Sequence, residues 1–316
     1  MAETAKVAVI ATGVIGRSWI RVFARGGCET RVWDPNPSML DAAIAWHTDE
    51  VRQEREQGLD GGTEGKVVAC ATLHDALDGA TYVQESGPEI LAVKREIFAG
   101  LDQLAQPAAI LASSVSTMDM TEIAAGLPGC ARCIVAHPVN PPHVVPVVEV
   151  LGGRDTHPSV VTRTVDFLRA VGQTPVVLKR FTPGFLLNRM QAALVLEAMD
   201  LLARDVADVD AIDAVIRDGL GLRWALMGPF GVANTNADGG VREYFTRYGE
   251  GYLSLGKDLK RPRQLDADFI ERVGRATDAM EHAAPRPAIR QWRDLLVRKI
   301  TQLKRAVPHP GHTGDA

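Results

Sequence analysis

The sequence has little of what marks secreted, membrane-bound or nucleic-acid-binding proteins. Among 316 residues there are four cysteines, and the one close pair, Cys130 and Cys133, lacks the second pair that a structural zinc site needs. No long basic run is present and the formal net charge is −4, which argues against nucleic acid or an anionic membrane as a partner. No apolar stretch is long enough to cross a bilayer, and the N-terminus shows no signal-peptide pattern. These absences predict a cytoplasmic protein with reduced thiols and no metal site, whose partner is a small molecule.

What is present is the composition of an ordinary globular protein, with 46% hydrophobic and 23% charged residues and enough length for two domains. Strand-like runs alternate with helix-like segments through the first part of the chain and stop beyond position 188. The predicted strands cover residues 6–10, 30–33, 67–70, 80–84, 108–112, 133–136, 144–151 and 176–178. This alternation predicts a mostly parallel sheet. We therefore expect an α/β fold, with a Rossmann-like domain at residues 1–188 and an all-helical domain at residues 189–316.

A glycine turn follows the first predicted strand. It reads Ala11-Thr12-Gly13-Val14-Ile15-Gly16 and leads into an amphipathic helix. Gly13 allows the backbone to approach a pyrophosphate at the helix N-terminus, and Gly16 allows close packing of helix on strand. Ala11 departs from the dinucleotide-binding fingerprint, which has its first glycine at this position. The alternative is a glycine-rich turn of some other α/β protein.

Asp34 ends the second predicted strand, 21 residues after Gly13. A carboxylate at this spacing is placed to accept hydrogen bonds from the adenosine ribose of a dinucleotide. The same charge would repel a 2′-phosphate, so the residue favours NAD over NADP. Arg17 and Arg31 are nearby cations that oppose this preference.

The pattern around His137 predicts a proton-transfer pair. The apolar run 133–136 delivers His137 to a proline-rich loop, and a second apolar run, 144–151, carries Glu149. Twelve residues are enough to turn and bring the carboxylate back beside the imidazole. A buried carboxylate on one imidazole nitrogen fixes the tautomer and leaves the other nitrogen free to move protons. The same pattern also fits a core histidine beside an exposed glutamate.

Polar candidates follow the carboxyl ends of several predicted strands, where ligands bind in parallel sheets. They are Asp34, Glu89, Ser116 and His137. Four such residues along one edge are hard to explain by packing. Ser116 by itself also fits the N-cap of a helix near residues 118–126.

A long helix is predicted to begin after Thr182, its N-cap, with Pro183 at the first helical position. Asn188 then lies one and a half turns into the helix, within an apolar stretch. A buried amide needs hydrogen-bonding partners. Asn188 therefore either faces the histidine and a substrate or satisfies backbone groups nearby.

Four segments together resemble the 3-hydroxyacyl-CoA dehydrogenase superfamily, and more closely its lambda-crystallin and L-gulonate 3-dehydrogenase branch. They are residues 13–19, 134–142, 184–189 and 291–294, and the resemblance extends over nearly the whole chain. It implies that His137 is the catalytic base paired with Glu149, and that Ser116 and Asn188 contact the reacting oxygen. It implies further that an NAD site is formed by Gly13, Val14, Ile15, Gly16, Asp34, Glu89, Lys94, Ser116 and Asn140, with Asn140 beside the nicotinamide.

The activity implied by the resemblance is NAD-dependent oxidation of the 3-hydroxyl of a small 3-hydroxy acid to the 3-keto acid. L-Carnitine 3-dehydrogenase and 3-hydroxybutyryl-CoA dehydrogenase activities are the enzymatic alternatives. A structural, crystallin-like protein or an NAD sensor is the non-catalytic alternative. All four polar positions of the catalytic set are occupied, which argues against a non-catalytic role.

A free acid such as L-gulonate is the leading substrate guess. Residues 37–66 correspond to the helical segment that helps to hold the CoA tail in acyl-CoA relatives. Here this acidic excursion from the sheet carries seven acidic and three basic side chains, whereas the phosphates of CoA call for a cationic site. Arg223 would bind a substrate carboxylate bidentately; its alternative role is a surface or interface arginine. Carnitine would need an aromatic cage for its ammonium group, for which Trp224, Phe230 and Tyr248 are candidates. The apolar faces of the helical domain predict a homodimer.

Overall fold

The structure is a computed structural model that describes residues 5–59, 64–259, 267–281 and 285–307. Contacts divide the chain into two compact units. The larger unit holds Met1–Leu187 together with Asp294–Thr301, and the smaller unit holds Asn188–Arg293 with Gln302–Pro308. The stretch Asp294–Thr301 therefore counts with the larger unit, although the sequence places it in the helical domain of residues 189–316.

The larger unit is built on one eight-stranded sheet with the order β3-β2-β1-β4-β5-β6-β7-β8. The strands are β1 (Lys6–Ile10), β2 (Glu29–Trp33), β3 (Val67–Ala69), β4 (Tyr82–Glu85), β5 (Ile110–Ser113), β6 (Cys133–Pro138), β7 (Val147–Gly152) and β8 (Thr174–Val177). All neighbouring strands are parallel except β6 and β7, which are antiparallel. The order of the first six strands is that of a doubly wound dinucleotide-binding fold. The predicted α/β class and mostly parallel sheet are confirmed.

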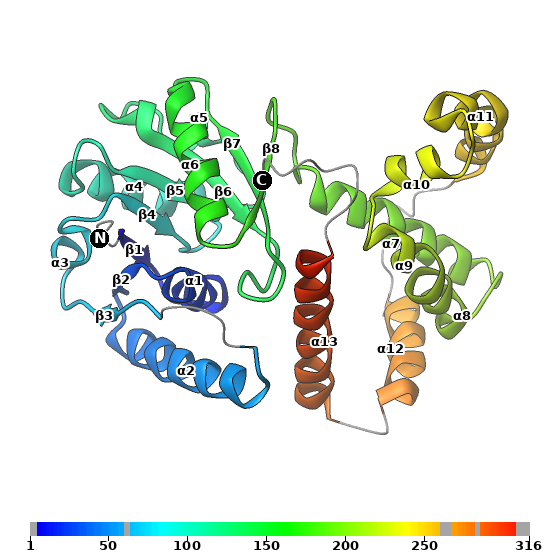
Figure 1. Cartoon of the computed structure of the whole chain (residues 1–316), viewed down its shortest axis with the longest axis horizontal. Helices are drawn as coiled ribbons and strands as arrows, with labels where there is room; N and C mark the ends of the chain where they lie inside the picture. The colour runs from blue at the N-terminus through cyan, green and yellow to red at the C-terminus, as the bar shows by residue number, and fades with distance from the viewer. Residues whose placement is uncertain (1–4, 60–63, 260–266, 282–284, 308–316) are drawn as a thin grey trace. The chain divides into compact units, whose positions relative to one another are not determined.

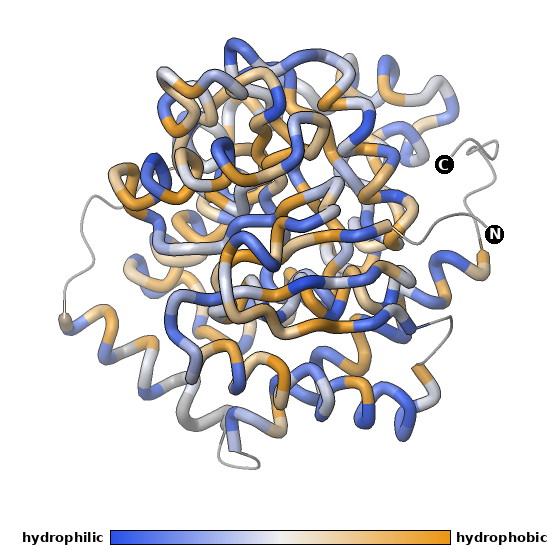
Figure 2. The backbone as a smooth tube through the Cα atoms, turned by 90° about the vertical axis from the view of Figure 1, so that its left-hand side faces the viewer, coloured by the Kyte–Doolittle hydropathy of each residue, from blue (hydrophilic) through white to orange (hydrophobic). Residues whose placement is uncertain are grey.

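Helices cover both faces of this sheet (Figure 1). They are α1 (Val14–Arg25), α2 (Pro37–Glu56), α3 (Leu73–Leu77), α4 (Leu91–Leu104), α5 (Met120–Ile123) and α6 (Pro158–Ala170). Val7 and Val9 of β1 join a core with residues of α1, α2 and α6, whereas Ala8 and Ile10 join a second core with residues of α3, α4 and α5. Successive strand residues point to opposite faces, so an unbroken apolar strand supplies both cores. Along the helices, hydrophobic and hydrophilic residues alternate, as expected for helices that cover a core on one side (Figure 2).

The remainder of the chain is helical. Its elements are α7 (Leu187–Ala203), α8 (Val209–Ala214), a π-helical turn (Val215–Leu220), α9 (Gly221–Trp224), α10 (Pro229–Thr235), α11 (Gly240–Asp258), α12 (Ala267–Glu281) and α13 (Arg286–Ala306). No strand occurs among the described residues after β8, which confirms the predicted all-helical C-terminal part. Within the described residues, no helix combines the length and apolarity required of a membrane span.

The start of α7 differs from the sequence prediction. Helix α7 begins at Leu187, whereas the cap-and-proline pattern predicts a start at Pro183. The amide of Phe185 donates to the carbonyl of Thr182 at 2.9 Å, so residues 182–185 form a tight turn instead. Gly184 and Phe185 have φ of 76° and 49°, values that no right-handed helix contains. Proline at the second position and glycine at the third favour this turn over a helical turn.

Candidate active site

The structure brings His137 and Glu149 together at the antiparallel pair of strands. The two residues lie directly opposite each other on β6 and β7. His137 Nδ1 lies 2.9 Å from Glu149 Oε2, and the side chains are 9% and 3% exposed. The alternative of a histidine beside an exposed glutamate does not hold, because the carboxylate is buried against the imidazole.

Hydrogen bonds keep the Glu149 carboxylate ionised. Burial by itself raises the pKa of this carboxyl, but the hydrogen bonds from His137 and from the amides of Leu187 and Leu186 outweigh it, and the pKa lies below its ordinary value. An ionised carboxylate only accepts hydrogen bonds, so Nδ1 of His137 must carry the hydrogen. The lone pair is then on Nε2, which is the nitrogen available to take a proton.

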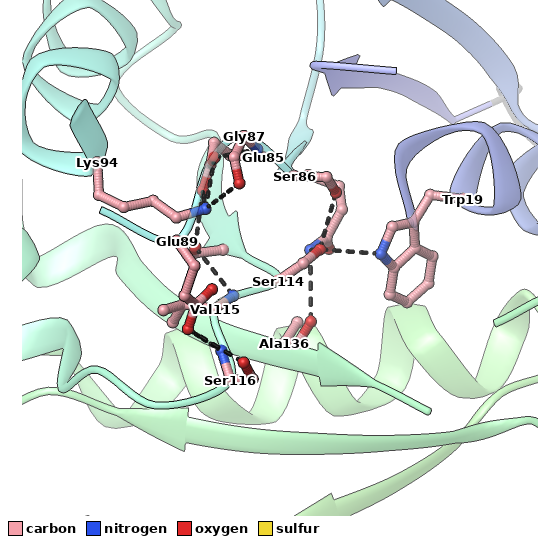
Figure 3. Close-up of polar contacts among 12 residues, drawn as sticks. Trp19, Glu85, Ser86, Gly87, Glu89, Lys94, Ser114, Val115, Ser116 and Ala136 are labelled. Carbon is pink, nitrogen blue, oxygen red and sulfur yellow. Dashed lines mark hydrogen bonds and ion pairs between the residues drawn. The ribbon is translucent and has the colours of Figure 1, made fainter. Parts of the chain in front are cut away.

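Ser116 follows β5 and is held by Glu89, which follows β4. Glu89 Oε1 accepts hydrogen bonds from the amide and Oγ of Ser116, at 2.8 and 3.1 Å, and from the amide and hydroxyl of Thr117, both at 3.0 Å. Figure 3 shows Glu89 reaching across to Ser116. Ser116 is not a helix cap, because Asp119 caps α5 through the amide of Thr121 at 2.8 Å. Ser116 is thus a hydroxyl fixed at the edge of the sheet.

Lys94 forms a buried ion pair with Glu85, a residue that the sequence analysis missed. Its ammonium lies 2.8 and 2.9 Å from the two carboxylate oxygens and 3.0 Å from the carbonyl of Gly87 (Figure 3). The side chains are 1% and 0% exposed. An ammonium group has three hydrogens, and all of them are used here. The predicted contact of Lys94 with the cofactor stays a prediction. An acid at the end of an apolar strand, with a lysine nine residues on, is the sequence signal for this pair.

A second polar network centres on Ser114, between the ends of β4 and β6 (Figure 3). Its Oγ accepts from Trp19 Nε1 at 3.1 Å and from Gln84 Nε2 at 2.8 Å, and lies 2.9 Å from Ser86 Oγ. With both lone pairs occupied, Ser114 must donate its own hydrogen to Ser86. Gln84 Nε2 also lies 3.4 Å from the carbonyl of Ala136, the residue before His137. The network links the loop after β4 to the strand that carries the imidazole.

The glycine turn fits a dinucleotide. Gly13 precedes α1 without any side-chain cap, and a Cβ added there would meet nothing within 4 Å, so the first amides of α1 are open to an anion. A Cβ on Gly16 would lie 1.9 Å from the carbonyl oxygen of Ala11, which makes glycine necessary. Ala11 has a φ of 68°. It adopts the left-handed conformation for which the fingerprint uses glycine, so the turn keeps its shape at some strain in the backbone.

Asp34 lies beside the glycine turn, and its contact with the adenosine ribose stays a prediction. Its Oδ2 accepts from the amide and hydroxyl of Thr12, at 2.7 and 2.9 Å, and its Oδ1 accepts from the amide of Asn36 at 2.8 Å. The two hydrogen bonds from Thr12 occupy both lone pairs of Oδ2, whereas Oδ1 still has one for a ribose hydroxyl. The three bonds fix the carboxylate beside the glycine turn.

We expect Asp34→Asn to reduce the preference for NAD over NADP, measured as the ratio of kcat/KM values, by roughly 10- to 100-fold, because it removes the charge that repels a 2′-phosphate. Asparagine keeps an oxygen that can accept from Thr12, so the turn is retained. Asp41→Asn, which removes an exposed charge from α2, is the control. An equal change in both variants would contradict a role for Asp34 in cofactor choice.

The remaining predicted site residues are placed as follows. Asn140 is exposed in the loop after β6. Asn188 is half-buried in the first turn of α7 rather than one and a half turns in, because the helix begins at Leu187. Arg223 is exposed near the end of α9 in the smaller unit, directly after the π-helical turn. Their roles toward cofactor and substrate stay predictions.

Comparison with family models gives two adjoining matches. Residues 6–181 match the model described as "3-hydroxyacyl-CoA dehydrogenase, NAD binding domain", and residues 184–274 match the "3-hydroxyacyl-CoA dehydrogenase, C-terminal domain". Together they cover far more than half of the chain, and they meet at the Thr182–Leu187 turn.

Similar curated proteins include a lambda-crystallin homolog from Bos taurus, 38% identical over 96% of both chains. An L-carnitine dehydrogenase from Streptomyces griseus is 36% identical over 86% of this chain and 81% of that protein. Among solved structures, the NAD⁺-dependent 5-formyl-3-hydroxy-2-methylpyridine 4-carboxylic acid 5-dehydrogenase aligns over 97% of this chain and 100% of its own, with a TM-score of 0.82 and 26% identity. The 3-hydroxybutyryl-CoA dehydrogenase of Escherichia coli aligns over 74% of this chain and 49% of its own, with a TM-score of 0.63 and 29% identity.

These matches bear out the resemblance seen in the sequence, including the assignment of NAD as cofactor. The chain belongs to the 3-hydroxyacyl-CoA dehydrogenase family, in the branch of the lambda-crystallins, and is an NAD-dependent oxidoreductase that acts on a CH–OH group.

Proposed function

We propose that the protein oxidises the 3-hydroxyl of a small, free 3-hydroxy carboxylate to the 3-keto acid, with L-gulonate as the leading candidate. The observation that carries the proposal is the buried His137–Glu149 pair, in which hydrogen bonding on Nδ1 leaves Nε2 as the proton acceptor. Ser116 supplies a hydroxyl at the same edge of the sheet.

The residues divide the work as follows. The substrate hydroxyl donates to Nε2 of His137 and accepts from Ser116, whose hydroxyl turns from Glu89 to reach it. NAD supplies the acceptor for the hydride that leaves the same carbon. His137 takes the proton as the carbonyl forms, and Glu149 stabilises the resulting imidazolium. Asn188 is proposed as a second donor to the reacting oxygen.

The negative charge of residues 37–66 argues against a CoA ester as substrate less strongly than the sequence suggests. Glu54 accepts from Arg21 Nε at 2.9 Å and lies 3.2 Å from Arg298 Nη1, and Glu50 pairs with Arg298 as well. Glu64 pairs with Arg21 at 2.6 Å. These pairs place two arginines from outside residues 37–66 against three of the seven acids, which offsets two of their charges, and a fourth acid, Asp60, lies outside the described residues. The preference for a free acid therefore depends mainly on Arg223.

Arg223 suits a small carboxylate because it forms no ion pair with any residue that the structure describes. It also borders an aromatic cluster of the smaller unit, composed of Phe230, Tyr244, Phe245, Tyr248 and Tyr252. The 2.7 Å hydrogen bond with Tyr252 raises the pKa of Tyr244, and the nearby guanidinium of Arg223 opposes that rise.

This arrangement favours L-carnitine as the second candidate. An arginine beside aromatic rings would bind the carboxylate and the quaternary ammonium of one small zwitterion. Phe230 and Tyr248, two of the residues predicted for the cage, belong to the cluster. Among the described residues, Trp224 makes no ring contact with it.

The test is kcat/KM for L-gulonate, L-3-hydroxybutyrate, L-carnitine and L-3-hydroxybutyryl-CoA. The wild type is expected to prefer a free acid, and Arg223→Met to lower kcat/KM for free acids by roughly 10- to 100-fold, as for a lost charged hydrogen bond. Arg217→Met is the matched control, since Arg217 is exposed on the preceding turn and pairs with Asp218. Clear preference for the CoA ester, or equal effects of the two substitutions, would refute the proposal. Loss confined to carnitine in Tyr248→Leu would identify carnitine as the substrate.

We also propose a homodimer formed through the helices after β8. Large hydrophobic side chains are exposed there, among them Met190, Leu194 and Val195 on α7 and Ile216 in the π-helical turn. Such a surface is typical of an interface. A monomeric mass in light scattering at micromolar concentration would contradict it.

A further inference from the structure

The turn that precedes α7 lies directly against the catalytic pair. Phe185 is fully buried, and its ring centroid is 5.3 Å from that of the His137 imidazole at an interplanar angle of 60°. The ring of Phe181 also contacts that of Phe185, with 6.1 Å between the centroids. A φ of 49° is unusual for a bulky residue, so the backbone here is determined by its packing. Phe185 therefore fixes the turn to the core beside the imidazole.

The two residues after Phe185 direct their backbone amides at the catalytic carboxylate. Glu149 Oε1 accepts from the amide of Leu186 at 2.7 Å and from that of Leu187 at 3.0 Å. Oε2 is the oxygen that faces His137. Both carboxylate oxygens thus have hydrogen-bond partners, Oε2 the imidazole and Oε1 the two backbone amides.

Few charges compete with these amides. On β6 the titratable group facing Glu149 is His137 itself, and β8, the other neighbour of β7, carries none. Lys179 and Arg180, which follow β8, are exposed. The turn itself contributes no charged side chain, so its action on the pair comes from the backbone.

We propose that Leu186 and Leu187 are positioning residues for the proposed oxidation: their amides, aimed at Glu149 by the buried Phe185, lower the proton affinity of the His137–Glu149 pair. Hydrogen bonds to an anion stabilise it and weaken its hold on a shared proton. The inference rests on the proposed function, which makes His137 the base.

The chain offers a substitution that removes one amide hydrogen. Leu187 is the first residue of α7, a position where proline is tolerated because its N–H has no partner within the helix. The acid limb of the pH profile, where kcat/KM falls as the pH is lowered, is expected to move up by roughly 0.5–1 pH unit in Leu187→Pro. The reason is that one of the two hydrogen bonds from backbone amides to the Glu149 carboxylate is lost. Leu187→Ala loses the side chain but keeps the amide, and should leave the limb in place. The position of the limb is the readout, because the rate itself also responds to displacement of the adjacent Asn188.

A second measurement does not depend on any substrate. The imidazole signals of His137, identified by their absence in His137→Gln, are followed by NMR against pH in wild type and both variants. We expect the same upward displacement in Leu187→Pro alone. Unchanged titration in Leu187→Pro would overturn the inference. If the wild type oxidises no 3-hydroxy acid, the proposed function fails, while the NMR titration still decides the inference.

Phe185→Ala covers the case in which Leu187→Pro does not fold. Without the buried ring the turn is free to move, so both amides should bind Glu149 less well. The expected displacement has the same sign as in Leu187→Pro. A wild-type titration in a folded Phe185→Ala protein would also overturn the inference.

Discussion

Replacing His137 by alanine is expected to lower kcat by roughly 10²- to 10⁴-fold, the usual contribution of a positioned general base. Because Nδ1 carries the hydrogen that bonds to Glu149, the free lone pair of the imidazole is on Nε2. The other ring nitrogen therefore cannot accept the substrate proton in its place. NADH binding, followed by fluorescence, should be retained, because the glycine turn and Asp34 lie on other strands. His74→Ala, on the exposed surface, is the control. A near wild-type rate in His137→Ala would show that another group carries the proton.

Glu149→Gln should also lose much of the rate, for a reason specific to this geometry. The amide oxygen can still accept from Leu186 and Leu187, which turns the NH₂ group toward His137. Nδ1 would then have to accept, and the hydrogen would move to Nε2, the wrong tautomer for a base. Undiminished activity in this variant would contradict the tautomer assigned to His137.

The second large effect concerns stability. Lys94→Met is expected to destabilise the protein by about 3–5 kcal/mol, the cost of leaving one partner of a buried ion pair uncompensated. Glu85 is fully buried, and among the described residues it would keep the hydroxyl of Ser113, at 2.7 Å, and the amide of Gly87 as partners. Urea unfolding measures the loss as a lower midpoint at unchanged slope.

The double variant Lys94→Met/Glu85→Gln is the matched control. It removes both charges, so it should recover part of the stability lost by Lys94→Met. If Lys94→Met costs less than about 1 kcal/mol, or if the double variant is the less stable of the two, the pair does not act as a buried ion pair.

Local sequence determined the sheet and the chemistry carried on its edge. Apolar runs with β-branched residues specify strands, and glycines at fixed spacing specify the turn into α1, because both depend on contacts between near neighbours. The His137–Glu149 pair was also predictable. Its partners are 12 residues apart on adjacent antiparallel strands, where the register alone sets them opposite each other.

Only the tertiary structure decided which distant residues contact the acids of α2 and the His137–Glu149 pair. Arg298 reaches Glu50 across 248 residues, which changes the charge expected for α2. The Pro183-Gly184 sequence favours the turn that delays the start of α7 to Leu187, but the packing of Phe185 beside His137 is a tertiary contact that no local signal contains. Helix caps and charge counts take account only of residues that are close together in the sequence. Which amide meets a buried carboxylate, and which arginine neutralises an acid, is settled only when distant elements pack and exclude water from the groups between them.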